Sequence, residues 1–246
     1  YQGDLFDPKP ALKKFEGQRP PGATLRTERI TGGLLPSIRK FAPRGNSGVI
    51  VSDLLPEISR VIDDICVLKG CHSDNPNHNP AMFLMNCGAL TSAVPSVGSW
   101  ISYGLGSENR NLPAYVVLVT GLTPGGGSSL WGNGFLPSVH QGVRFRTKGD
   151  PVLYASNPKG VDRPARGRII DDVVRLNRLR LSRVGDPEIA TRIANYELAF
   201  RMQSTMPKLL DQSQETEATK KLYGIGEDAT DAFGKQCLHA RRMVES

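Results

Sequence analysis

The sequence lacks an apolar run long enough to cross a lipid bilayer, and no cationic-then-apolar secretion signal opens it. Cysteine is scarce: the four cysteines form no Cys-x-x-Cys pair, which argues against a zinc ribbon. The glycines at 125–127 lack the Gly-Lys-Ser/Thr ending of a phosphate-binding P-loop, so we reject that motif. What remains is an ordinary globular composition over 246 residues, 39% apolar and 22% charged.

The sequence is basic, with a formal net charge of +7, and its basic residues are densest between 163 and 183. Five residues of this region share one face at helical spacing and mix both signs of charge: Arg168, Asp171, Asp172, Arg175 and Arg178. The pattern predicts a solvated helix face whose ion pairs contribute about 0.3–0.5 kcal/mol each. It argues against a nucleic-acid partner.

We expect a single domain with three successive parts. Residues 1–48, rich in Pro, Gly, Lys and Arg, predict an irregular arm. Residues 49–160 predict an α/β core, and residues 161–246 predict a helical part. The first residue is not Met, and the last predicted helix is not followed by a strand. We therefore expect the chain to be an internal, incomplete piece of a longer domain.

Two apolar runs predict buried strands, Ile65–Lys69 and Tyr115–Val119. Two helices are expected between them. Pro80 starts the first, which runs from Ala81 to Cys87 and is stopped by Gly88, and Ser96 caps the second, which extends to Gly104. The order strand, helix, helix, strand predicts a parallel α/β sheet flanked by helices. Cys66, within the first strand, is predicted to be buried, as is Cys87. A disulfide is left open for an exported protein.

Other helices are predicted from capping and periodicity. Asp53 is expected to cap a helix that extends to Ile65, and Gly185 to end one that begins at Pro164. Asp186 is expected to cap the next helix, with Pro187 as its first residue. Two core-facing stripes are predicted after residue 186: Ile189, Ile193, Tyr196 and Phe200 in one helix, and Phe233, Cys237, Ala240 and Val244 in the last. Between these helices we expect a polar connector over 207–228, and we expect residues 121–142 to form a long surface loop anchored by Trp131, Phe135 and His140.

The polar segment after the first predicted strand holds His72, Asp74 and His78, and it opens the next helix. Sites gather at the carboxyl ends of parallel strands, and a helix N-terminus favours an anion. These side chains can ligate a metal or move protons, although histidines hydrogen-bonded to the backbone of a polar loop are the alternative. Asp4 and Asp7 are a second candidate, since two nearby carboxylates share a cation or cap a turn.

Six motifs, in order along nearly the whole chain, resemble the bacterial domain-of-unknown-function family fifteen-oh-one: Asp4–Pro10, Ser52–Pro56, His72–His78, Pro95–Trp100, Leu112–Val116 and Gly185–Ile189. That family is sulfatase-like and is similar to the alkaline phosphatase superfamily, whose members hydrolyse phosphate or sulfate esters with bound divalent metals. The resemblance implies an alkaline phosphatase-like sheet truncated at both ends. It also implies a zinc, calcium or manganese ion and a periplasmic or secreted protein.

The resemblance implies roles for individual residues. Asp4 would be a metal ligand, His72 a second ligand or a proton shuttle, and His78 would face the scissile group. On the sulfatase motif Cys-x-Pro-Ser-Arg, His78 takes the place of the cysteine and Met82 that of the arginine. Formylglycine chemistry is therefore not expected, and His78 is left open as a metal ligand, a phosphohistidine nucleophile or a vestige. Further ligands would lie beyond Ser246, so we expect the 246 residues alone to show little activity or metal binding.

The motifs and the resemblance together support two functions. The first is a metal-dependent hydrolase-like domain that acts on phosphate or sulfate esters of a small molecule or a polysaccharide. The alternative is a non-catalytic exported protein that binds a polysaccharide or a surface partner. The replaced arginine, and the absence of Ser, Thr or Cys at position 78, favour the alternative.

Overall fold

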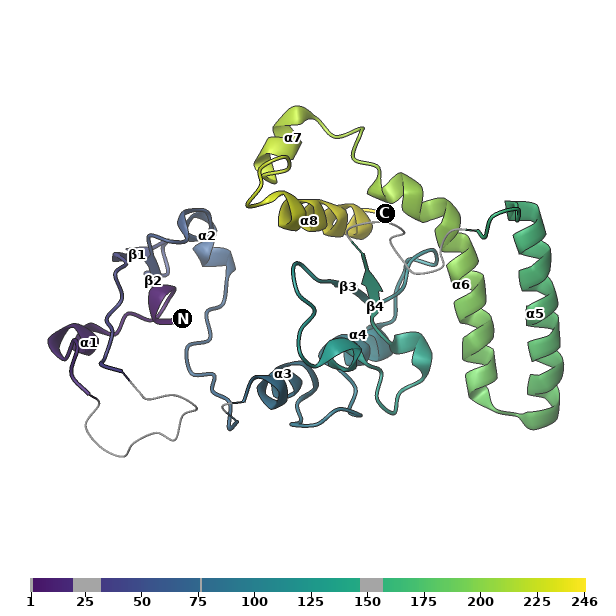
Figure 1. The fold of residues 1–246 in the computed structure, drawn as a ribbon, viewed down its shortest axis with the longest axis horizontal. Coiled ribbons are helices and arrows are strands. Elements are labelled where there is room, and N and C mark those ends of the chain that lie inside the picture. The colour runs from purple at the N-terminus through teal and green to yellow at the C-terminus, as the bar shows by residue number, and fades with distance from the viewer. Residues whose placement is uncertain (1, 20–31, 76, 147–156) are drawn as a thin grey trace. The chain divides into compact units, whose positions relative to one another are not determined.

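The computed structural model describes residues 2–19, 32–75, 77–146 and 157–246. The chain divides into two compact units, Tyr1–His72 and Ser73–Ser246, whose elements are labelled in Figure 1. This division does not coincide with the predicted boundaries after residues 48 and 160. No helix in the described ranges combines the length and the apolar character that crossing a membrane requires.

The first unit is built on an antiparallel ribbon of β1 (Phe41–Arg44) and β2 (Val49–Ser52). The Asp63 carboxylate accepts hydrogen bonds from the backbone N–H groups of Asn46 (2.8 Å) and Ser47 (2.9 Å), which fastens the turn between the strands. These bonds lower the pKa of Asp63 because they stabilise its charged form. We expected residues 1–48 to form an irregular arm. That expectation is wrong for Phe41–Arg44, which form β1.

Helices in the first unit are short: η1 (Gln2–Asp4), α1 (Pro10–Lys14), α2 (Pro56–Arg60) and η2 (Ile62–Asp64). The long helix expected after Asp53 is wrong, because the chain leaves helical geometry at Val61 (φ −117°, ψ 20°). Leu55, not Asp53, occupies the N-cap position of α2. Pro56 is the first residue of this helix, where its missing N–H costs little.

The strand predicted at Ile65–Lys69 is wrong, since the segment has no regular secondary structure. A strand requires a neighbour to satisfy its backbone hydrogen bonds, and no described strand pairs with this segment. Ile65, Leu68 and Cys66 are exposed, so the predicted burial of Cys66 is also wrong.

The second unit begins with α3 (His78–Cys87) and α4 (Val97–Leu105). Gly88 ends α3 in the left-handed conformation (φ 70°), as predicted. The strands β3 (Val116–Leu118) and β4 (Val143–Phe145) then pair in parallel, with Val116 opposite Val143. The strand expected at 115–119 is thus confirmed over three residues. A larger sheet of the alkaline phosphatase type stays a prediction.

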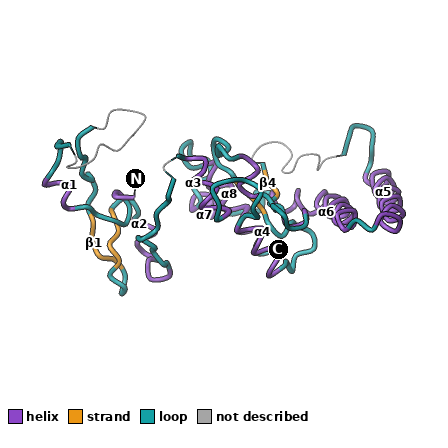
Figure 2. The backbone as a smooth tube through the Cα atoms, turned by 90° about the horizontal axis from the view of Figure 1, so that it is seen from below, coloured by secondary structure: helices purple, strands orange, loops and turns teal. Residues whose placement is uncertain are grey.

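Four helices complete the chain: α5 (Arg163–Val184), α6 (Pro187–Leu210), α7 (Glu217–Leu222) and α8 (Asp231–Val244). Figures 1 and 2 show α5 and α6 side by side as a long helical hairpin. Gly185 ends α5 and the Asp186 side chain caps α6, and both features were predicted. The connector expected from Pro207 begins later, because α6 continues through that proline to Leu210.

Two apolar clusters hold the second unit together. One packs α6 against the strands through Leu112, Phe145, Met202, Met206 and Leu209. The other closes the hairpin through Ile170 and Val174 of α5 and Ile189 and Ile193 of α6. The predicted α6 stripe is confirmed at its first two positions, whereas Tyr196 is exposed.

The apolar face predicted for α8 is wrong at both ends, since Phe233 and Val244 are exposed. The helix instead buries Gly234, Gln236 and Leu238. A side chain at Gly234 would lie 1.9 Å from the backbone oxygen of Tyr223, so only glycine permits this close packing.

Candidate functional site

His78 is the first residue of α3, and its side chain is exposed. Asn77 occupies the N-cap position without a side-chain capping bond, although its backbone oxygen accepts from Ala81 N–H (3.0 Å). The N–H groups of His78 and Asn79 therefore receive no cap from the Asn77 side chain, and they carry the positive end of the helix dipole, whereas Pro80 has no N–H to offer. The prediction that His78 opens a helix is confirmed.

The glycine-rich loop lies against this first turn of α3. An added Cβ at Gly125 would lie 2.2 Å from Oδ1 of Asn79, so the glycine backbone lies directly against that side chain, and a larger residue would displace the exposed amide. Further along, Leu130 and Trp131 are buried and end η3 (Gly127–Trp131). The structure thus brings the amide of Asn79, the residue after His78, against the backbone of Gly125, which is 46 residues away in the sequence.

The other predicted ligands lie elsewhere. Asp4 is half-buried in the first unit and accepts a hydrogen bond from the Ser37 hydroxyl. Asp7 forms an ion pair with Lys9. His72 belongs to the first unit and is exposed. Across the described ranges, no three His, Cys, Asp or Glu side chains are arranged to hold one metal ion.

The four cysteines are free thiols, and they differ in exposure. Cys66 and Cys71 are exposed, Cys237 is half-buried, and Cys87 is buried at the end of α3, as predicted. Burial raises the pKa of the Cys87 thiol, which favours the unreactive protonated form.

A second polar cluster, not anticipated from the sequence, lies on the inner face of α4. Ser96, Ser99 and Ser102 are buried one turn apart. The Ser96 and Ser99 hydroxyls are 3.0 Å apart, and Ser99 donates to the Gly132 carbonyl oxygen (3.0 Å). The repeat of serine every three residues was the signal in the sequence.

The last serine of this cluster binds η4 (Ser138–His140) to α4. Its Oγ lies 2.9 Å from Nδ1 of His140, and the ring of Tyr103 meets that imidazole edge-on at 5.4 Å. A serine–histidine pair can act in acyl transfer, but Ser102 is only 2% exposed, so no substrate reaches its hydroxyl. The pair holds the loop in place, which confirms the predicted anchoring role of His140.

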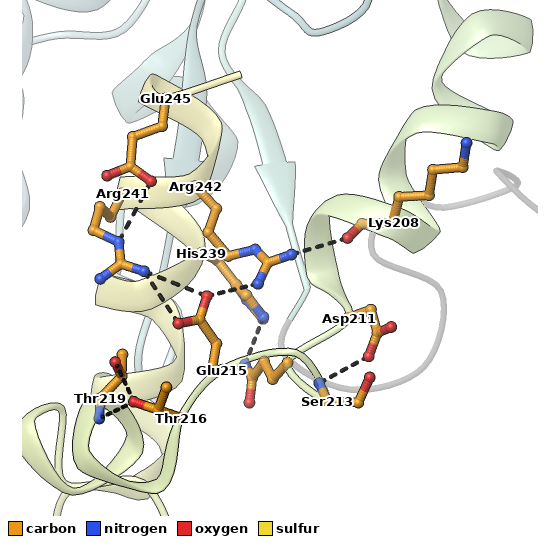
Figure 3. A network of polar contacts seen from close by, with 11 residues as sticks. Lys208, Asp211, Ser213, Glu215, Thr216, Thr219, His239, Arg241, Arg242 and Glu245 are labelled. Atoms are coloured by element: carbon orange, nitrogen blue, oxygen red, sulfur yellow. Dashed lines mark hydrogen bonds and ion pairs between the residues drawn. The ribbon is translucent and has the colours of Figure 1, made fainter.

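A third polar group lies between α8 and the connector after α6, shown in Figure 3. The Glu215 carboxylate accepts from Arg242 (2.7 Å) and from Arg241 (3.3 Å). Arg242 also donates to the Lys208 carbonyl oxygen (3.1 Å), so its guanidinium connects α8 both to the end of α6 and, through Glu215, to the connector. Lys208, Glu215 and Arg242 line part of an open cavity of about 510 Å³.

His239 joins this network through Gln212, whose side-chain Nε2 lies 2.7 Å from its Nε2 (Figure 3). Burial is the main reason that the pKa of His239 is lowered, followed by the neighbouring cations Arg242 and Lys235; a hydrogen bond to the Leu210 backbone opposes them. Because protonation is harder in the folded state, the folded protein binds fewer protons than the unfolded chain.

We therefore expect the second unit to lose stability as the pH falls below about 6.5, the ordinary pKa of histidine. His239→Gln should remove this part of the pH dependence. The free energies of unfolding of the variant and the parent should therefore differ less at pH 8 than the parent's own values at pH 8 and pH 5.5. Urea unfolding at pH 8 and pH 5.5, with both proteins, measures the difference. Equal pH dependence in the two proteins would contradict the assignment.

The second unit is therefore a largely helical unit with one short parallel strand pair, in which an exposed histidine opens α3 and the glycine loop lies against the first turn of that helix. The chain belongs to the family described as "Protein of unknown function (DUF1501)", whose family model matches residues 2–246. This confirms the family drawn from the motifs, while the sulfatase-like placement stays a prediction. No curated protein and no solved structure matches the chain.

Proposed function

We propose that this chain is a hydrolase-like domain for phosphate or sulfate esters, and that it receives the ester anion at the start of α3. The observation that carries the proposal is the exposed His78 beside uncapped N–H groups and the glycine loop. An anionic oxygen is suited to this position, because backbone N–H groups and the helix dipole stabilise negative charge there.

In this proposal the backbone N–H groups of the first α3 turn hold an oxygen of the ester. In one role the His78 imidazolium donates a proton to the leaving oxygen while water attacks the ester. In the other, a ring nitrogen attacks the phosphorus atom as the P–O bond to the leaving group breaks, and water then hydrolyses the N–P bond. Asn79 and Gly125 act as positioning residues in this proposal, since the Asn79 side chain lies directly against the Gly125 backbone.

The family resemblance further supports a zinc, calcium or manganese ion and an exported, periplasmic or secreted protein. A bound ion would polarise the ester oxygens. Asp4 and His72, with His78, remain the proposed ligands, but the described residues of neither unit form such a group. We therefore assign no step of the reaction to the ion.

A second candidate function, polysaccharide binding without catalysis, is favoured by exposed aromatic rings. Trp100 meets Tyr103 edge-on at 6.1 Å and Phe135 at 5.7 Å, and all three rings remain exposed. Exposed aromatic rings offer flat apolar surfaces with polar edges, which suit partners that are both apolar and hydroxylated.

One experiment on the full natural protein separates the two functions. Turnover of an aryl phosphate and an aryl sulfate is measured with zinc, manganese or calcium, and after chelation. Metal-dependent turnover is the expected result. Absence of turnover under every condition, with retention on a polysaccharide matrix that Trp100→Ala abolishes, would replace the hydrolase proposal with the second candidate.

A further inference from the structure

The outward face of α5 carries an apolar stripe. The inner face of the helix packs on α6 through Ile170 and Val174. On the opposite side, Ile169, Leu176 and Leu179 are 45%, 64% and 54% exposed. At 100° per residue these three positions lie within about 80° of one another on one side of the helix. Figures 1 and 2 show this helix at the outer side of the α5–α6 hairpin.

Arginines border this stripe. Seven arginines and two aspartates give α5 a formal charge of +5, most of the +7 of the whole chain. Helical geometry places Arg168 on one side of the stripe and Arg180 on the other. Arg183 lies on the stripe itself, beyond Leu179. All three are exposed, and none forms an ion pair within the described part of the chain.

The neighbouring arginines behave differently. Arg175 pairs with Asp172 at 3.1 Å, as predicted, and Arg178 pairs with Glu197 of α6 at 3.8 Å. The prediction of a solvated, ion-paired face is thus confirmed for Arg175. It does not account for the exposed leucines or for the uncompensated charge beside them. Exposed apolar side chains that line up between like charges are characteristic of a docking surface.

We propose that the outward face of α5 docks an acidic amphipathic helix of a partner protein. Charge complementarity supports this occupant. Leucines of the partner would cover Leu176 and Leu179, while its carboxylates would reach Arg168, Arg180 and Arg183. An anionic lipid surface is the competing occupant, and Asp172 argues against it. That carboxylate lies on the stripe between Ile169 and Leu176, where entry into hydrocarbon would be costly.

The test uses the full chain and two labelled synthetic helices of about 20 residues, a length that favours helix formation. Both peptides carry leucines at i, i+3, i+4 and i+7, with glutamates on the flanks of one and lysines on the flanks of the other. Fluorescence anisotropy is expected to show binding of the glutamate peptide alone. Leu176→Ser should weaken that binding several-fold, because it removes apolar contact.

The charge-reversed variant Arg180→Glu with Arg183→Glu should bind the glutamate peptide at least about tenfold more weakly than the parent does, equivalent to roughly 1.4 kcal/mol of binding free energy. The same variant should gain binding of the lysine peptide. The matched control is Arg39→Glu with Arg44→Glu, two exposed positions of the first unit that change the net charge equally. The control should bind as the parent does. Circular dichroism checks that α5 remains helical in each variant.

Three outcomes would overturn the proposal. The first is no binding of the glutamate peptide up to millimolar concentration. The second is equal weakening by the control variant, which would show that only net charge matters. The third is binding to anionic phosphatidylglycerol vesicles that Leu176→Ser abolishes, without peptide binding, which would assign the face to a membrane surface.

Discussion

His78→Ala in the full natural protein is expected to lower kcat/KM for an aryl phosphate or sulfate by about 10²–10⁴-fold, the usual contribution of a general acid or base. The fold should persist, because the imidazole is exposed and forms no hydrogen bond with a described residue. Substitutions at such positions usually change stability by less than about 0.5 kcal/mol.

The matched control is Met85→Ala, an exposed position in the same helix, two residues before its end. It should leave both activity and stability near parental values. Rapid quenching with a ³²P-labelled substrate distinguishes the two roles left open for His78. Acid-labile label on the parent, absent from His78→Ala, identifies a phosphohistidine, whereas lost turnover without label identifies proton transfer. Parental activity in His78→Ala would remove the residue from the site.

Local chemistry explains why the helices were predicted better than the sheets. Gly88, Gly185 and Asp186 act within one turn of the residues they cap, so their effect is visible in a short stretch of sequence. The run Ile65–Lys69 has the composition of a strand, but a strand exists only if a partner satisfies its hydrogen bonds. Pairing partners are distant in sequence, as the register of Val116 with Val143 illustrates.

In the candidate site, too, the local features could be predicted from the sequence and the tertiary contacts could not. The place of His78 at a helix start followed from Pro80, two residues away. The approach of Gly125 to Asn79 depends on tertiary packing, and nothing near either residue signals it. The orientation of α4 was not predicted, because its buried side is made of serines while the apolar Trp100 and Ile101 are exposed.

Phe145→Ala is expected to destabilise the second unit by about 3–5 kcal/mol, the usual cost of truncating a fully buried phenylalanine. Phe145 is the last residue of β4 and is 2% exposed among Leu112, Met202 and Met206. Its ring connects the only parallel strand pair of the described residues to α6, and the surrounding side chains come from three separate elements. A cavity there cannot close without moving a helix.

Phe135→Ala is the matched control, since it removes the same side chain from the same unit at a position that is 71% exposed. Its cost should be about 0.5–1.5 kcal/mol, the value of the edge-to-face contact with Trp100. Both tryptophans of the chain, Trp100 and Trp131, belong to the second unit, so fluorescence during urea unfolding reports on that unit. Equal unfolding midpoints for the two variants would show that the Phe145 cluster is not the core of this unit, and that α6 is held by the polar connector around Glu215 instead.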